Sequence, residues 1–124
     1  MAEGRFKHFY PDWEVYSAGT QPADKVHPLA IKVMAEDWIN ISKQFPKLVD
    51  KFINQFFDVV LTVCDDAREN CPVFVGEVKH RIHHSFEDPA RAPGSQQEQL
   101  KVFQKVRDQI KEFVRDFSVE IIWL

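Results

Sequence analysis

Phe57-Asp58-Val59-Val60-Leu61-Thr62-Val63 is the stretch of sequence that decides the fold. It is almost continuously apolar, which is typical of a strand that is buried on both faces of a parallel sheet. Helical patterns lie on either side of it, over residues 28–38 and 96–117. Because strands that alternate with helices form parallel sheets covered by helices, the pattern predicts an α/β fold with a mostly parallel sheet.

The helix over residues 96–117 is the longest predicted element. Ser95 and Glu98 form a capping-box pattern at its start. Its apolar side chains recur at helical spacing, so one face of the helix is predicted to lie in the core. These side chains are Phe103, Val106, Ile110, Phe113 and Phe117.

Shorter elements follow from the same kind of pattern. Residues 1–9 and 48–55 are predicted to form short helices, and Pro28 suits the first position of the helix over 28–38. Two further strands are predicted over residues 13–18 and 79–84. The tail, 118–124, is apolar, and we expect it to pair with the sheet as a strand.

Length and composition limit the class of protein. The chain has 124 residues, 44% of them hydrophobic, and a net charge of −3. This suits one domain, residues 1–124, with no nucleic acid or membrane as partner. No signal peptide or apolar run long enough for a bilayer is present, so a cytoplasmic location is expected. Two cysteines in such a chain are more often catalytic, redox-active or buried than joined in a structural disulfide.

Several motifs together resemble the thioredoxin-coupled arsenate reductases, which have the low-molecular-weight tyrosine phosphatase fold. The most specific is the pair Cys64 and Cys71 at a spacing of seven, followed by Asp88-Pro89. The others are Met1-Ala2-Glu3-Gly4, Tyr16-Ser17-Ala18-Gly19-Thr20, His27-Pro28-Leu29-Ala30-Ile31, Asn70-Cys71-Pro72, and Val102 to Asp108. The resemblance implies a three-layer α/β domain that reduces arsenate without a bound cofactor or metal.

The resemblance also implies roles for three residues. Asp88 is similar to the general acid that protonates the oxygen leaving arsenate. Cys64 is similar to the second thiolate of a disulfide cascade and Cys71 to the third, after which thioredoxin reduces the Cys64–Cys71 disulfide. Glu3 and Ser17 match positions that support the phosphate-binding loop. The segment 44–47 replaces a stretch that is usually small and polar near the active site, and His27 replaces a better capping residue.

The first thiolate of that family lies in a Cys-x5-Arg loop, which these 124 residues do not contain. Neither Cys64 nor Cys71 has an arginine six positions later. We therefore expect a chain that starts after the first strand and the oxyanion loop, with Met1 matching an internal methionine of the family. As given, such a chain is expected to be inactive and poorly stable, because the neighbours of the missing strand keep unpaired backbone groups.

Other interpretations of the same residues remain open. Cys64 and Cys71 also fit two ordinary buried thiols, and Asp88 also fits a turn residue before proline. The chain as a whole also fits a phosphotyrosine phosphatase of the same fold, or a non-catalytic dithiol or binding module. His80, His83 and His84 suggest a metal site only weakly, because adjacent residues of a strand face opposite ways.

Overall fold

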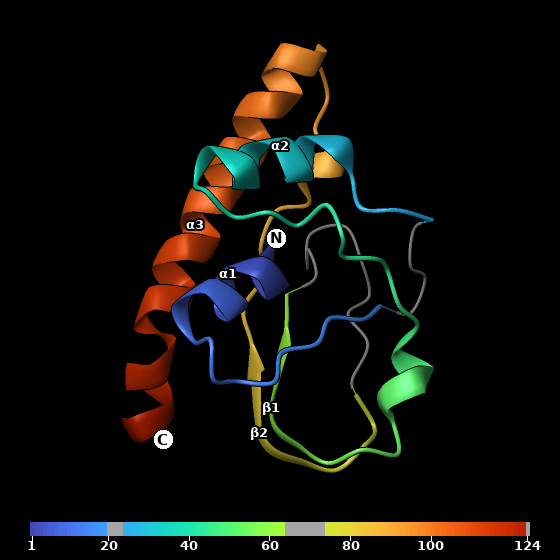
Figure 1. Cartoon of the computed structure of the whole chain (residues 1–124), viewed down its shortest axis with the longest axis vertical. Coiled ribbons are helices and arrows are strands. Elements are labelled where there is room, and N and C mark those ends of the chain that lie inside the picture. Colours follow the sequence, from blue (N-terminus) through green and yellow to red (C-terminus); the bar gives the residue numbers. More distant parts are fainter. Residues whose placement is uncertain (20–23, 64–73, 124) are drawn as a thin grey trace.

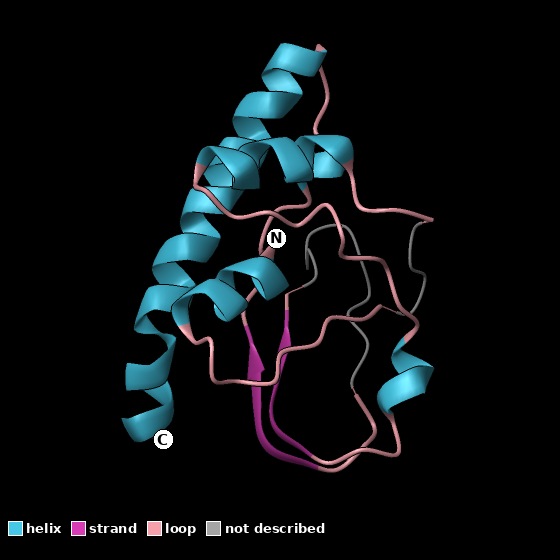
Figure 2. Cartoon of the chain, viewed as in Figure 1, coloured by secondary structure: helices cyan, strands magenta, loops and turns pink. Residues whose placement is uncertain are grey.

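A computed structural model of the chain describes residues 1–19, 24–63 and 74–123, and from residue 118 onward it describes the backbone alone. Along the described chain two α-helices come first, two neighbouring strands follow, and a long α-helix ends the order (Figures 1 and 2). The α-helices are α1 (Ala2–Phe9), α2 (Pro28–Glu36) and α3 (Gln96–Trp123). The strands are β1 (Phe57–Thr62) and β2 (Val78–His83), and the short 3-10 helices are η1 (Val49–Phe52) and η2 (Pro89–Arg91).

The sheet of the described residues is a parallel pair, β1 beside β2, with Leu61 in register with Ile82. Leu61, Ile82 and Val59 pack against the apolar face of α3. The prediction that β1 is buried on both faces is wrong for the described residues, since its apolar side chains are only partly buried. One face of the pair is covered by α3, and the other has no α-helix against it among these elements (Figure 1).

Two apolar clusters lie along α3, and its predicted face is confirmed. Phe103 packs with residues of α2 and the following segment, while Val106, Ile110 and Phe117 pack with α1 and the sheet. Ser95 caps the helix as predicted: the Glu98 amide donates to Ser95 Oγ at 3.2 Å. Such a side-chain acceptor satisfies one of the unpaired amides of the first turn.

The helix α2 begins at Pro28 as predicted, and His27 caps it. The Leu29 amide donates to His27 Nδ1 at 3.1 Å, and the imidazole lies 4.7 Å from the Phe103 ring. His27 is therefore a working cap, although histidine is not a preferred residue at that position.

The helix α1 lies close to the segment that follows α2. A Cβ atom on Gly4 would lie 2.6 Å from Ile41 Cγ2, so only glycine permits this approach. From the same helix, Phe6 packs edge-on against Phe117 of α3 at 5.0 Å between ring centroids. An eight-residue helix is too short to be stable alone, and these contacts hold it in place.

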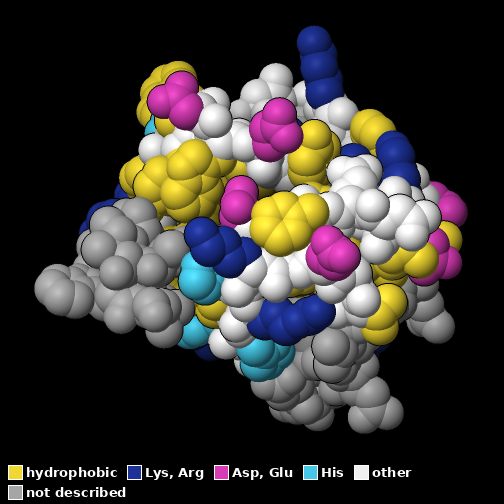
Figure 3. All heavy atoms as spheres, turned by 90° about the horizontal axis from the view of Figure 1, so that it is seen from below, with side chains coloured by type: hydrophobic (Ala, Val, Ile, Leu, Met, Phe, Trp, Pro, Cys, Tyr) yellow, Lys and Arg dark blue, Asp and Glu magenta, His cyan; other side chains and the backbone are white. Residues whose placement is uncertain are grey.

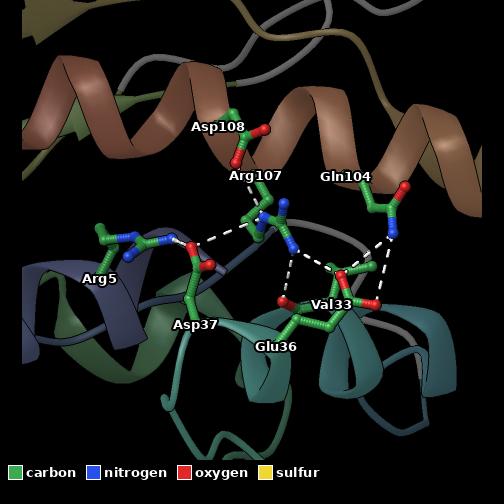
Figure 4. A network of polar contacts seen from close by, with 7 residues as sticks. All are labelled: Arg5, Val33, Glu36, Asp37, Gln104, Arg107 and Asp108. Atoms are coloured by element: carbon green, nitrogen blue, oxygen red, sulfur yellow. Dashed lines mark hydrogen bonds and ion pairs between the residues drawn. The ribbon is translucent and has the colours of Figure 1, made fainter.

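A network of charged side chains joins the three helices (Figure 4). Arg5 of α1 is buried and donates from Nη2 to Asp37 Oδ2, at the end of α2, at 2.5 Å. Arg107 of α3 donates from Nη1 to Glu36 Oε1 at 2.7 Å and to the Val33 carbonyl at 3.0 Å. Its Nε lies 3.6 Å from Asp37 Oδ2. The carboxylate of Asp37 therefore has an arginine on either side.

Two predicted strands are wrong. Residues 14–18 form neither a strand nor a helix, and in this region only Gly19 makes a bridge, to Leu48. An extended segment becomes a strand only beside a neighbour that completes a ladder of hydrogen bonds. The tail is also not a strand, since α3 continues to Trp123. Lengthening an existing helix avoids the cost of nucleation, which outweighs the weak strand preference of the tail.

Large apolar side chains are exposed at the amino ends of the two strands. They include Phe56, which is 59% exposed, and Val75, which is 80% exposed. Figure 3 views the molecule from this end and shows apolar side chains interspersed with charged ones. Among the described residues no helix is both long and apolar enough to cross a bilayer.

Candidate functional site

The carboxyl ends of β1 and β2 meet at one edge of the sheet. Thr62 Oγ1 lies 2.6 Å from His83 Nδ1, and the His84 amide donates to the Thr62 carbonyl at 2.9 Å. In parallel sheets, ligands bind beyond this edge. Cys64 follows the end of β1 by two residues, and Asp88 follows the end of β2 by five.

The predicted cysteines, Cys64 and Cys71, lie outside the described residues, so their distance and oxidation state stay predictions. Asp88 is described. Its Oδ1 accepts from the Ala90 amide at 3.0 Å and so caps η2, and its Oδ2 lies 3.5 Å from Arg91 Nε. The side chain is 35% exposed. This geometry is that of a turn residue, and the same carboxyl group remains accessible to solvent.

A second group of polar side chains surrounds Glu3 in the first turn of α1. The carboxylate is almost completely buried and accepts hydrogen bonds from Ser17 Oγ and from Lys7 Nζ, the latter at 3.0 Å. Lys47 Nζ lies 3.5 Å from Glu3 Oε1. Burial raises the pKa of Glu3, but the hydrogen bonds from Ser17 and Lys7 and the charge of Lys47 outweigh it, so the pKa is lowered overall.

A small cavity of about 160 Å³ adjoins this group. Its walls are Ser17, Ala18 and Gly19 on one side and Pro46 and Lys47 on the other. The two walls are joined by the backbone: the Gly19 amide donates to the Lys47 carbonyl at 2.9 Å, and the Val49 amide donates to the Gly19 carbonyl at 2.9 Å. The match of Glu3 and Ser17 to supporting positions indicated this region, but the sequence did not indicate the contact of Lys47, 44 residues away from Glu3.

The histidines of β2 and its end do not converge. His83 contacts Thr62, whereas the His84 ring stacks on Phe113 of α3 at 4.4 Å between centroids. The two adjacent side chains thus face opposite ways, as the strand pattern predicts. Within residues 1–19, 24–63 and 74–117, no three His, Cys, Asp or Glu side chains are grouped so that they could hold a metal ion.

The fold and the sequence together define the family. The model of the low-molecular-weight phosphotyrosine protein phosphatases matches residues 1–122, and the chain belongs to that family. Within it, the chain is similar to proteins named arsenate reductase. That of Bacillus subtilis (strain 168) is 43% identical over 119 residues, which are 95% of this chain and 84% of the relative. That of Shouchella clausii is 44% identical with the same coverage.

Solved structures of arsenate reductases share the fold. One in a phosphate-binding state has a TM-score of 0.78 and 31% identity, covering 97% of this chain and 86% of that one. One in an oxidised state has a TM-score of 0.74 and 32% identity with the same coverage. The predicted α/β class and the resemblance to arsenate reductases are confirmed by these comparisons.

Proposed function

We propose that the chain acts in the reduction of arsenate to arsenite by thiol–disulfide exchange. What supports this is the sequence position of Cys64, two residues after β1, and of Asp88, five residues after β2, because the carboxyl ends of these adjacent parallel strands form one edge of the sheet. Relatives that match 95% of the chain, 41–44% identical over 119 residues, are named arsenate reductase. The location that suits this activity is the cytoplasm, where thiols stay reduced.

The chemistry needs two electrons for arsenic, from As(V) to As(III). A cysteine outside these 124 residues, in a Cys-x5-Arg loop, forms a bond to arsenic, and Asp88 gives a proton to the oxygen that leaves as water. The Cys64 thiolate then attacks that sulfur, and arsenite leaves with the electron pair of the sulfur–arsenic bond. Cys71 next attacks Cys64, releases the first thiolate and leaves a Cys64–Cys71 disulfide. The dithiol of thioredoxin returns the two electrons.

The first experiment tests the cysteines in two proteins: the 124-residue chain, and the chain extended by the residues encoded in frame before Met1. With thioredoxin and its reductase, the extended protein is expected to consume reductant in proportion to arsenate, and Cys64→Ser and Cys71→Ser to abolish turnover. In the short chain, once it has been oxidised with a small-molecule disulfide, thioredoxin is expected to reduce the Cys64–Cys71 disulfide without arsenate. Hydrolysis of an aryl phosphate that survives both substitutions, with no arsenate turnover, would favour a phosphatase instead.

The second experiment separates the two interpretations of Asp88. Asparagine also caps helices but has no proton to give to a leaving oxygen. Asp88→Asn should therefore keep the fold while kcat falls roughly 100-fold or more. The matched control is Asp116→Asn, an exposed carboxylate of α3 that pairs with Arg115, as Asp88 pairs with Arg91. If kcat in Asp88→Asn equals that of the parent, Asp88 is a turn residue and not the general acid.

A further inference from the structure

The Glu3 carboxylate is buried, and burying an anion costs free energy unless a cation neutralises it. Its side chain is 4% exposed, and burying an unpaired carboxylate would cost several kcal/mol. The charged groups that face it are Lys7, Lys47 and the Met1 amine. Lys7 is 51% exposed and so is well screened by solvent. Lys47, with 13% of its side chain exposed, is the more buried of the two lysines.

The ammonium of Lys47 is held in position from several directions. It donates to the Phe45 carbonyl at 3.2 Å and lies 4.7 Å from the centre of the Phe45 ring. The backbone carbonyl of Lys47 also takes part, since it accepts a hydrogen bond from the Gly19 amide. One residue thus joins two segments, by its side chain to α1 and by its main chain to the wall of the cavity.

This junction lies beside the edge of the sheet where the reaction is proposed. Met1 and Ala2, at the start of α1, pack into the same apolar cluster as Leu61 and Ile82, which stand next to the last residues of β1 and β2. Figure 1 shows the first turn of α1 beyond the tips of the two strands.

We propose that Lys47 is a positioning residue: through Glu3 it holds the Ser17–Gly19 wall of the cavity against the first turn of α1. That this wall matters for arsenate reduction rests on the proposed function, whereas the contact between Lys47 and Glu3 does not. Without the ammonium, Glu3 keeps the exposed Lys7, the Ser17 hydroxyl and the Met1 amine. The bond between Gly19 and Lys47 then loses the side-chain anchor that reinforces it.

Three variants test the contact in the 124-residue chain. Lys47→Met keeps the aliphatic stem without the charge, Lys47→Arg keeps the charge, and Lys43→Met removes an exposed lysine of the same segment. Amide exchange measured by NMR is expected to be about tenfold faster at Gly19 and Val49 in Lys47→Met. A tenfold change corresponds to about 1.4 kcal/mol, close to the low end of what a hydrogen bond to a charged group contributes. Lys47→Arg and Lys43→Met should stay near the parent. Unchanged exchange in Lys47→Met would overturn the proposal.

A second readout separates positioning from general support of the fold. The Glu3 carboxyl, followed by carbon NMR, should titrate at higher pH in Lys47→Met than in the parent, and Lys43→Met should leave it unchanged. In the extended protein the acid limb of the arsenate rate profile should move to higher pH in Lys47→Met and return with Lys47→Arg. A faster Gly19 exchange with an unmoved Glu3 titration would overturn the proposal. If no protein reduces arsenate, the proposed function fails, while exchange and titration still decide on Lys47.

Discussion

The buried arginine of α1 leads to an asymmetric prediction about stability. Arg5 has one charged partner among the described residues, Asp37, whereas Asp37 also has Arg107 at 3.6 Å. Arg5 Nε already has no hydrogen-bond partner there. Asp37→Ala leaves the guanidinium buried without a counter-charge, which costs 3–5 kcal/mol in comparable pairs. Because the Asp37 side chain is 23% exposed, we expect about 3 kcal/mol, near the lower end.

Removing the other partner should cost much less. Arg5→Met replaces a buried cation by an apolar side chain, and Asp37 keeps Arg107, so the expected loss is about 1 kcal/mol. The double variant Arg5→Met/Asp37→Ala should be more stable than Asp37→Ala alone. In that variant Arg107 still has Glu36 at 2.7 Å.

Urea unfolding followed by circular dichroism measures these differences. For a chain of this size, a loss of about 3 kcal/mol corresponds to a decrease in Tm of roughly 10 °C. The control is Asp116→Ala, whose pair with Arg115 is exposed on both sides, and which should change stability by less than about 0.5 kcal/mol. Two results would contradict this explanation of the charged network: Asp37→Ala losing no more stability than the control, or Arg5→Met losing more stability than Asp37→Ala.

Three further measurements test single features of the fold. The lowered pKa of Glu3 means that its stabilisation is complete above its unfolded-state pKa and is lost as the pH falls through the folded-state value. The stability difference between parent and Glu3→Gln should therefore begin to shrink below about pH 4 and vanish once the pH is below the folded-state pKa. His27→Ala should lose about 0.5–2 kcal/mol in urea unfolding while His27→Asn, which restores a cap, loses less; equal losses would remove the role of the cap. Gly4→Ala should lose about 1–3 kcal/mol by contact with Ile41, whereas Gly19→Ala, with open space at its Cβ, should not.

Elements with strong local patterns could be predicted from the sequence. The apolar run of β1 and the helical spacing of Phe103, Val106 and Ile110 specify a strand and a helix without reference to the rest of the chain. The cap at Ser95 was equally local, since its partner is three residues away.

What the sequence could not predict depends on partners far along the chain. The segment 14–18 has the composition of a strand but forms none, because a strand needs a neighbour that local propensity does not reveal. Arg5 and Asp37 are 32 residues apart, and Glu3 and Lys47 are 44 apart. The prediction for the tail failed for a different reason. Its apolar residues predicted a strand from local preference, but the preceding helix α3 continues through them.

The helix α1 carries both charged clusters, and this gives a last prediction. Glu3 and Arg5 are two residues apart, so they point to different flanks of the helix, one toward Lys47 and the other toward Asp37. Among the described residues, the two clusters share no hydrogen-bond or ion-pair partner. If they act separately, Lys47→Met and Asp37→Ala should add in the double variant within about 0.5 kcal/mol. A double variant less destabilised than the sum by more than this would mean that losing either cluster already detaches α1, so that the whole short helix, and not each contact, is the unit that positions the cavity wall.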